Sequence, residues 1–585
     1  MPSVFSHEWD TPAFKGKTSF STGLYINGQF VDGSSKSEIE VLNPKNDVDI
    51  AVGAAQKAFD TVWGLNVSGA QRGELLNKLA ALMEEHKSEL AALEALDNGK
   101  TFGWAHGTDV TFGISVVKYY AGWADKIHGQ TIETDEKKLT YTRHEPIGVV
   151  VSTITSLYSL LDNPHPMSTG ANSAMELPSP PAHMEDRACT RRREHHRPQV
   201  LGTHPPHRDP HGPPHPRSRL PPGVVNILTG YGNTVGQAIS THMRIDKVAF
   251  TGSTLVGRKV MEAAAKSNLK QVTLELGGKS PNIIFNDADL EQAVNWSAHG
   301  IFWNHGQACC AGSRIFVQAG IYDEFLKRFT ARAQAIKLGD PFNPETNQGP
   351  QVSQIQYDRI MNYIESGKQA GAKVHLGGDR FGTEGYFINP TIFTDTTPDM
   401  KIVQEEIFGP VGVVIKSEDE EDVLRQANDT MYGLAAAVFS QNLNRALQTA
   451  HKLKAGTAWV NCVNHVHPNV PFGGYKQSGI GRELGEYALH QYVFLLFYFS
   501  SLFLEARNPP AQIGLPSEEK LLLAPIVLVH LFPLLDKVLL LPLEMLDPLG
   551  LFNPPLMLFV LPTLNLAYVA LLFEGPAPTD LITSD

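Results

Sequence analysis

The sequence contains little cysteine and no excess of basic charge. Its 585 residues include only four cysteines, Cys189, Cys309, Cys310 and Cys462. These are too few and too irregularly spaced for a disulfide framework or a zinc ribbon, so they indicate a reducing compartment. The formal net charge of −12 argues against a polyanionic partner. We therefore expect no binding of nucleic acid.

The chain also lacks a targeting signal and a long unbroken apolar run. The segment MPSVFSHEWDTPAF has neither a basic end followed by an apolar core nor an arginine-rich amphipathic pattern, so we expect a cytoplasmic protein. The chain becomes rich in leucine and proline from about residue 493. Its longest apolar stretches, 521–535 and 548–573, are interrupted by polar residues and prolines, so membrane attachment is not expected.

The sequence does contain a regular alternation of short apolar runs and amphipathic segments. KVAF (247–250), PNIIF (281–285) and AAAVF (435–439) each precede a stretch with helical periodicity. This alternation predicts an α/β architecture with mainly parallel sheets. Further upstream, Ser68 and Gln71 have the spacing of a capping box, which predicts the start of a helix.

A cysteine in a glycine-rich turn is the first candidate for chemistry. Cys309 lies in NHGQACCAGSRIFV (304–317), just before a run typical of a strand. A free cysteine is more often a small buried apolar residue than a nucleophile, so this segment alone leaves both interpretations open. Glu275, in TLELGGKSPNIIF (273–285), lies at a strand edge beside two glycines. A carboxylate in a partly apolar setting can activate a thiol or its water, so the pair makes chemical sense.

The segment KVAFTGSTLVG (247–257) is a candidate phosphate site. A strand ends near Phe250, glycine permits a tight turn, and a helix begins at about Ser253. Backbone N–H groups and the helix dipole would then face one point. The strict dinucleotide fingerprint of spaced glycines is absent, and such a segment occurs often by chance. Taken alone, it does not decide the function.

Five motifs, in this order, carry a resemblance to a known family: FTGSTLVG, LELGGKSPNIIF, GQACCAGSR, EEIFGPV and PFGGYKQSGIGRELGEYAL. Together they resemble the aldehyde dehydrogenase superfamily, in its fungal NAD(P)-dependent branch. The resemblance implies a Rossmann-type cofactor domain, an α/β catalytic domain and a small oligomerisation extension. The expected parts are a cofactor domain at 20–274, a catalytic domain at 275–470, a return segment at 471–492 and an atypical tail at 493–585.

The resemblance also implies the reaction and its residues. Cys309 would attack an aldehyde to give a thiohemiacetal, hydride transfer to NAD(P)⁺ would leave a thioester, and Glu275 would activate water for hydrolysis. Cys310 would be structural. The cofactor would be NAD, with NADP as the alternative, and no metal is implied. Nine residues would contact the cofactor: Phe250, Gly252, Ser253, Val256, Gly257, Gly232, Leu276, Glu406 and Phe408.

The resemblance further implies a small aldehyde as substrate and a homo-oligomer as the assembly. The aldehyde is aliphatic or aromatic, since NCVNHVHPNV near the site contains no charged anchor for a phosphate or carboxylate. His465 and His467 in that segment could share one strand face, but a metal site is not expected. After Tyr492 the leucine-rich tail replaces the family's final strand, which pairs across the subunit interface. This replacement would weaken assembly.

The block 151–220 departs from the family pattern. It is crowded with histidine, arginine and proline, as in TRRREHHRPQV (190–200), and has no strand or helix period. When its possible codons are read one base later, GANSAMELP permits Gly-Gln-Ile-x-Pro-Trp-Asn-Phe-Pro. MEDRACTRRREHHRPQ permits Trp-Lys-Ile-Gly-Pro-Ala-Leu-Ala-x-Gly-Asn-Thr-Ile-Val-Leu-Lys. These are the family's missing motifs, so we interpret the block as frame-shifted by a retained intron. A basic nucleic-acid arm and a histidine-rich metal tract are the alternatives.

This interpretation has consequences for activity. Glu176 stands where the shifted frame gives the oxyanion-hole asparagine, and Gln199 where it gives the lysine for the adenosine ribose. Loss of one oxyanion donor lowers a rate by about 10²–10³, so we expect no measurable activity from the chain as printed. The shifted frame also permits Lys-x-x-Glu, whose carboxylate would favour NAD over NADP. The alternative function is a catalytically dead family member.

Overall fold

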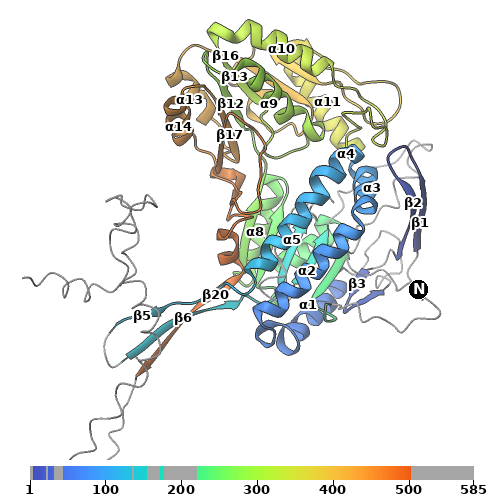
Figure 1. The fold of residues 1–585 in the computed structure, drawn as a ribbon, viewed down its shortest axis with the longest axis vertical. Helices are drawn as coiled ribbons and strands as arrows, with labels where there is room; N and C mark the ends of the chain where they lie inside the picture. Colours follow the sequence, from blue (N-terminus) through green and yellow to red (C-terminus); the bar gives the residue numbers. More distant parts are fainter. Residues whose placement is uncertain are drawn as a thin grey trace, which may run out of the picture. The chain divides into compact units, whose positions relative to one another are not determined.

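The structure, a computed structural model, describes residues 4–21, 24–31, 44–134, 138–154, 172–176 and 220–501. All of them lie within one unit of the chain, Met1–Leu502. They form two large sheets flanked by helices and two small antiparallel sheets (Figure 1). The α/β prediction is therefore confirmed.

The first sheet has the strand order of a dinucleotide-binding fold. Its order is β19-β11-β10-β7-β8-β9-β3-β4, and the five strands from β11 to β9 run parallel. Because the chain order reverses between β7 and β10, a crevice is expected beyond the carboxyl ends of these two strands. The strands are β3 (Leu24–Ile26), β4 (Gln29–Val31), β7 (Val150–Ile154), β8 (Asn172–Glu176), β9 (Val225–Thr229), β10 (Lys247–Thr251), β11 (Gln271–Glu275) and β19 (Gly479–Ile480).

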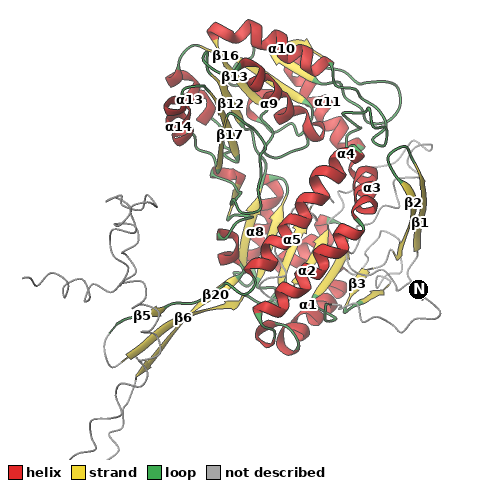
Figure 2. Cartoon of the chain, viewed as in Figure 1, coloured by secondary structure: helices red, strands yellow, loops and turns green. Residues whose placement is uncertain are grey.

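Helices pack on this sheet and on one another. The capping box at the start of α2 is confirmed, since the Ser68 hydroxyl accepts from the Gln71 N–H and the Gln71 side chain accepts from the Ser68 N–H. α2 runs alongside α5 (Figure 2), and α8 packs on β10 and β11. The helices are α1 (Pro44–Thr61), α2 (Gly69–Glu85), α3 (Lys87–Asn98), α4 (Phe102–Trp104), α5 (Thr111–Trp123), α7 (Gln237–Thr241) and α8 (Thr254–Lys266).

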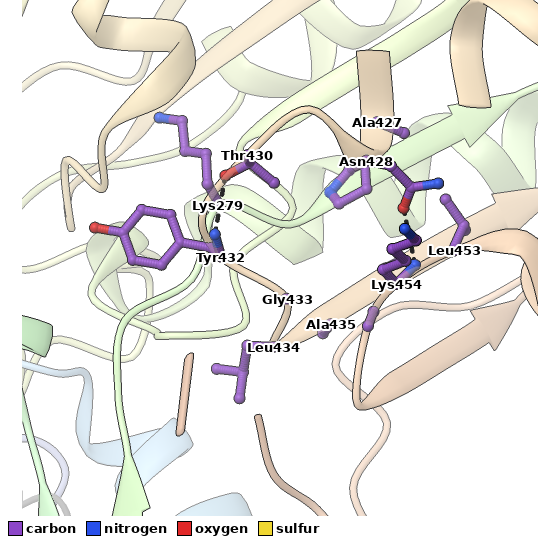
Figure 3. A pocket seen from close by; sticks show the side chains of 13 residues that line it. Lys279, Ala427, Asn428, Thr430, Tyr432, Gly433, Leu434, Ala435, Leu453 and Lys454 are labelled. Atoms are coloured by element: carbon purple, nitrogen blue, oxygen red, sulfur yellow. Dashed lines mark hydrogen bonds between the residues drawn. The ribbon is translucent and has the colours of Figure 1, made fainter. Parts of the chain in front are cut away.

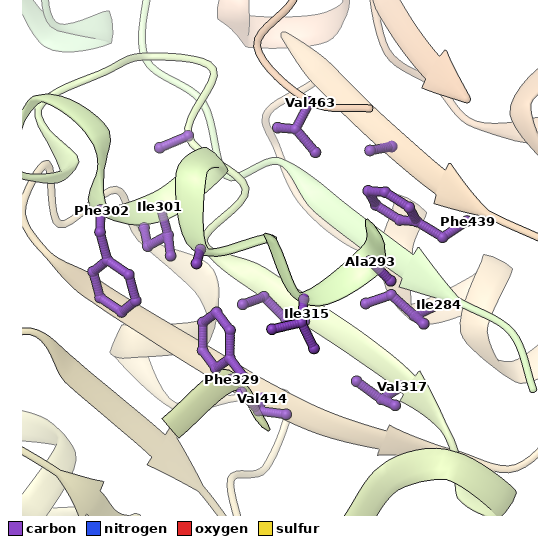
Figure 4. Packing of buried hydrophobic residues seen from close by; sticks show 14 of the residues in the cluster. Ile284, Ala293, Ile301, Phe302, Ile315, Val317, Phe329, Val414, Phe439 and Val463 are labelled. Atoms are coloured by element: carbon purple, nitrogen blue, oxygen red, sulfur yellow. The ribbon is translucent and has the colours of Figure 1, made fainter. Parts of the chain in front are cut away.

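The second sheet has the order β14-β15-β16-β13-β12-β17-β18, and all its strands except β14 run parallel. Buried side chains of its strands and of α9 and α10 form one apolar core (Figure 4). The strands are β12 (Pro281–Ile284), β13 (Arg314–Gln318), β14 (Lys373–Leu376), β15 (Thr391–Thr394), β16 (Val411–Ser417), β17 (Ala435–Phe439) and β18 (Thr457–Val460). The helices are α9 (Leu290–Phe302), α10 (Tyr322–Gln334), α11 (Gln354–Gln369), α12 (Lys401–Gln404), α13 (Glu420–Asn428) and α14 (Leu443–Lys452).

The two small sheets include a strand that was not expected. β20 (Val493–Ser501) pairs antiparallel with β6 (Lys138–Pro146), which also pairs with β5 (Thr131–Ile132). The prediction that the final strand is lost after Tyr492 is therefore wrong. The aromatic and aliphatic residues of this segment favour extended backbone. The segment therefore still pairs with β6 although its sequence differs from the family's. β1 (Val4–Asp10) and β2 (Lys15–Ser21) form the other small sheet.

Several sequence-based expectations concern residues that the structure does not describe. Most of the block 151–220 and all of the tail from 502 onward lie outside the described residues. Among the helices that are described, none is long and apolar enough to cross a membrane. Within the same ranges, no group of three or more His, Cys, Asp or Glu side chains could hold a metal ion, and His465 and His467 are exposed.

The core of the second sheet provides a test of the packing. Phe329 is 0% exposed, and its ring lies 5.5 Å from that of Phe325 and 5.7 Å from that of Phe302. Phe329→Ala should lower the free energy of unfolding by about 3–5 kcal/mol, because it removes buried area and leaves a cavity. Denaturant titration measures this loss. Phe381→Ala, at a ring that is 42% exposed, is the control and should change stability by less than about 1 kcal/mol. Equal losses would contradict this account of the core.

Candidate active site

The first part of the site lies where two neighbouring parallel strands end. Thr251, the last residue of β10, is the register partner of Glu275, the last residue of β11. The N–H of Gly252 donates to the Glu275 carbonyl at 3.0 Å, which fixes the turn after β10. Ser253 is the N-cap of α8, and its hydroxyl accepts from the Val256 N–H at 3.3 Å. The N-terminus of α8 therefore begins beside Glu275, and its dipole favours a phosphate there.

The remaining residues expected near the nucleotide differ in their surroundings. Gly257 packs against Leu276, because a Cβ at Gly257 would lie 2.6 Å from Leu276 Cδ2. Gly232 is exposed in the helical segment after β9, and a Cβ there would meet no described atom within 4 Å. Phe250 is 2% exposed and belongs to the core of the first sheet. Only the backbone of Phe250 can therefore contact a ligand.

Gly277 and Gly278, directly after β11, bring the cysteine loop and a carboxylate together. A Cβ at Gly278 would lie 2.2 Å from the carbonyl oxygen of Cys309, and one at Gly277 would lie 2.2 Å from Oε2 of Glu406. The Gly278 N–H also donates to Oε1 of Glu406 at 3.1 Å. Any side chain at 278 would collide with the Cys309 backbone carbonyl, and one at 277 would displace the Glu406 carboxylate, so glycine at both positions keeps this approach. Residues far apart in the sequence thus meet beside Glu275.

Cys309 lies in the loop between the short helix η6 (Trp303–Gly306) and β13. It is partly exposed, whereas Cys310 is buried in the core of the second sheet. A hydrogen bond with Cys310 raises the pKa of the Cys309 thiol well above its usual range, and burial and the carboxyl groups of Glu406 and Glu275 raise it further. Cys309 therefore rests as a thiol, and a base is needed to generate the nucleophilic thiolate.

Glu275 has the environment of a tuned carboxyl group. It is 7% exposed, and its Oε2 has no hydrogen-bond partner among the described residues. Burial and the neighbouring Glu483 raise the pKa of Glu275 well above its ordinary value, while Arg482 and the Gly474 N–H lower it. The base form of Glu275 therefore appears only as pH rises above the usual carboxyl range, which suits general base catalysis near neutral pH.

Two residues of α11, Gln356 and Arg359, hold the loop that carries Glu406 and Phe408. No sequence motif had indicated them. Nε2 of Gln356 donates to the Phe408 carbonyl at 2.7 Å, and the Arg359 guanidinium donates to the Glu406 carbonyl at 3.2 Å. Gln356 and Arg359 lie one turn apart on α11. This spacing was the only feature of the sequence that could have indicated that they act together. Burial raises the pKa of Glu406, while the Gly278 N–H, Arg359 and the buried Lys279 lower it, with a net value of about 7.

A small hollow lies between the second sheet and this loop, lined by Gly278, Ala308, Ser313, Glu406 and Phe408 among others. A second pocket of similar size is lined by Lys279, Asn428, Tyr432 and Lys454 among others. In Figure 3 the Lys279 ammonium and the Tyr432 hydroxyl lie on the side away from Asn428 and Lys454. Ala308 and Gly278, which line the first hollow, adjoin Cys309 along the chain and at its carbonyl oxygen, so the first hollow is the candidate for chemistry.

Two positions from the reading-frame analysis cannot be placed in the site. Glu176 ends β8, which pairs in parallel with β7 and β9, but only its backbone is described. Gln199 lies outside the described residues. The structure therefore brings together Glu275, Cys309 and Glu406 with the turn at Gly252 and Ser253, and it leaves the expected oxyanion-hole and ribose positions undescribed.

Comparisons with known proteins assign the chain to a family. The model of the "Aldehyde dehydrogenase family" matches residues 33–156 and 216–495. An aldehyde dehydrogenase of Agaricus bisporus is 62% identical over 509 residues, covering 84% of this chain and 97% of that protein. One of Aspergillus niger is 51% identical over 487 residues, covering 80% and 93%.

A solved structure, the NAD⁺ complex of aldehyde dehydrogenase from Bacillus cereus, is 42% identical with a TM-score of 0.73. It covers 82% of this chain and 96% of that one. The fold, the meeting of Cys309 with Glu275 and Glu406, and the family match over most of the described residues support one conclusion: the chain belongs to the aldehyde dehydrogenase family.

Proposed function

We propose that the protein oxidises a small aldehyde to a carboxylic acid with NAD⁺ as the hydride acceptor. The observation that carries the proposal is the contact at Gly277 and Gly278, which joins the Cys309 loop to Glu406 beside Glu275. A thiol nucleophile, a buried carboxyl group and a helix N-terminus then border one site. Their combination fits a thiol-dependent oxidation with a bound nucleotide.

The chain's own residues account for the covalent steps. The Cys309 sulfur attacks the aldehyde carbon, a carbon–sulfur bond forms, and the thiol proton leaves to a base. Loss of hydride from that carbon converts the adduct into a thioester. Glu275 takes a proton from water, whose oxygen attacks the thioester carbon. The carbon–sulfur bond then breaks, which releases the acid and regenerates Cys309.

The residues also fit NAD, which supplies the hydride acceptor when it is bound. Gly252, Ser253 and the first turn of α8 would bind the diphosphate, because their N–H groups and the dipole favour negative charge. Glu406 would accept hydrogen bonds from a ribose, and Phe408 would pack beside the nicotinamide. The exposed Gly232 leaves space at the same carboxyl edge of the sheet.

The substrate is expected to be small and uncharged. The hollow beside Glu406 is lined largely by glycine and apolar residues, so it lacks a cation that would anchor a phosphate or carboxylate. We also propose a homo-oligomer, since four side chains of β20 are 46–70% exposed and apolar: Phe494, Leu495, Phe497 and Phe499. Such a strand is unfavourable in water and favourable at an interface. The scarcity of cysteine supports a cytoplasmic location.

A second candidate is a catalytically dead member, and the block 151–220 favours it for the chain as printed. The family model matches up to residue 156 and again from 216. The gap in this match therefore lies within the block 151–220, where the shifted frame permits the family's motifs. We propose that the active protein is read in that frame. The printed chain carries Glu176 and Gln199 in place of asparagine and lysine.

The identity of the nucleophile can be tested without turnover. Iodoacetamide should alkylate Cys309 faster than Cys310 or Cys462, and NAD with an aldehyde should protect it, because the reagent and the substrate compete for the same sulfur. Mass spectrometry of the peptides measures the rates. Cys462→Ser, at the other partly exposed cysteine, is the control and should leave the fast phase intact. Loss of the fast phase in this variant would assign the reactivity to Cys462.

The role of Glu275 predicts a pH effect. Because its pKa is raised well above the ordinary carboxyl range, the carboxylate fraction and thus thioester hydrolysis should still increase with pH above that range. Glu275→Gln should lower turnover by about 10²–10⁴ and remove this pH dependence. The measurement is NADH formation from acetaldehyde by the protein read in the shifted frame. Glu262→Gln, on the exposed face of α8, should behave like the unaltered protein, and a Glu275→Gln variant that does so would refute the assignment.

The reading-frame proposal has its own test. The messenger RNA should lack the intervening bases across codons 140–230 and should encode the asparagine and lysine. The protein made from it should form NADH from acetaldehyde, while the printed chain should form none above background, because it lacks an oxyanion donor. If the messenger encodes the printed block, the dead-member function replaces the active one. Activity of the printed chain would overturn the proposed need for these two residues.

A further inference from the structure

A buried ion cluster lies next to the turn that leads to Cys309. Lys100, two residues after α3, donates from Nζ to the Asp109 carboxylate and lies 3.8 Å from Oε1 of Glu94. Asp109 belongs to the π-helical segment η2 (Ala105–Val110). The three side chains are at most 5% exposed. None of them takes part in the chemistry proposed above.

Stability alone does not explain this cluster. Burial raises the pKa of Glu94, Lys100 lowers it and Asp109 raises it, with a net value of about 7. One ammonium thus serves two carboxyl groups in the protein interior. Buried ion pairs are costly to desolvate, and an apolar replacement is often equally stable. The other groups that the Lys100 ammonium faces therefore indicate what the cluster does.

The remaining side of the ammonium faces the turn before Cys309. Lys100 Nζ lies 5.4 Å from the centroid of the Trp303 ring, within the range of a cation–π interaction. Burial and Lys100 together lower the pKa of His305 to about 3. His305 is 1% exposed, and its Nδ1 has no hydrogen-bond partner in the part of the chain that the structure describes. Packing holds this ring.

The turn itself has an uncommon backbone. Asn304 and His305 have φ angles of 48° and 57°, two consecutive left-handed residues that are not glycine. Such strain persists only where the surroundings enforce it. On one side, a Cβ at Gly306 would lie 1.9 Å from the Gly409 carbonyl, so residue 409 presses against the turn. The Lys100 cluster contacts the same turn through the Trp303 ring.

We propose that Lys100 is a positioning residue, whose ammonium, fixed by Asp109 and Glu94, holds Trp303 so that the turn 303–306 presents Cys309 to its substrate. This role rests on the proposed function, in which Cys309 is the nucleophile. Lys100 touches no reacting atom and acts through the turn. It links the helical layer of α3 and η2 to the loop that carries the thiol.

The test compares Lys100→Met, which removes the charge, with Lys100→Arg, which keeps it, in the full chain. Amide hydrogen exchange of peptides covering 301–313 should be at least tenfold faster in Lys100→Met, and iodoacetamide should alkylate Cys309 at least fivefold more slowly. Lys100→Arg should recover at least half of each effect on a logarithmic scale. Asp109→Asn should loosen the same peptide and provides the result if Lys100→Met does not fold.

Arg72→Met is the matched control. Arg72 is also a buried cation over a tryptophan ring, 5.2 Å from the Trp63 centroid, and it donates to the Gly64 carbonyl. Its loss should leave exchange at 301–313 and alkylation of Cys309 within twofold of the unaltered chain. Unchanged exchange in Lys100→Met, or equal acceleration in Arg72→Met, would overturn the proposal. If the unaltered chain shows no fast alkylation of Cys309, the proposed function fails, while the exchange result still decides whether Lys100 holds the turn.

Discussion

The close approach at Gly277 and Gly278 is the constraint on which the site depends. A side chain at either position would occupy the space of the Glu406 carboxylate or the Cys309 carbonyl. The two glycines directly follow the strand that ends in Glu275, so the same few residues place this carboxyl group and admit both partners. Both large sheets border the site at this segment, because β11 of the first sheet ends just before the two glycines and β12 of the second sheet begins only a few residues after them.

Burial then determines the chemistry of the groups that this approach collects. The pKa values of Glu275, Glu406 and Cys309 are all raised, chiefly because each group is shielded from water or lies near another acid. Raised acid pKa values keep the resting site less negative than its composition indicates. The electrostatic repulsion between these acids is therefore reduced, and the groups keep protons that they can transfer.

Much of the fold follows from local patterns. Apolar runs at 247–250, 281–285 and 435–439 become β10, β12 and β17, and the segments after them become helices. Ser68 and Ser253 cap helices because their hydroxyls accept backbone N–H groups only a turn away. The strand β20 was missed because the segment lacks the family's pattern, yet its aromatic and aliphatic residues favour extended backbone, and nine residues pair with β6.

The sequence by itself determined the α/β class, the strand-to-helix turns, and the identity of Cys309 and Glu275 as candidates, because these depend on neighbours within a few residues. The tertiary structure decided which distant groups meet. It joined Glu406 to Gly278, set Gln356 and Arg359 against the 406–408 loop, turned Phe250 into the core, and aimed Lys100 at the turn before Cys309. Contacts between segments far apart in the chain leave no periodic signal, so only packing could reveal them.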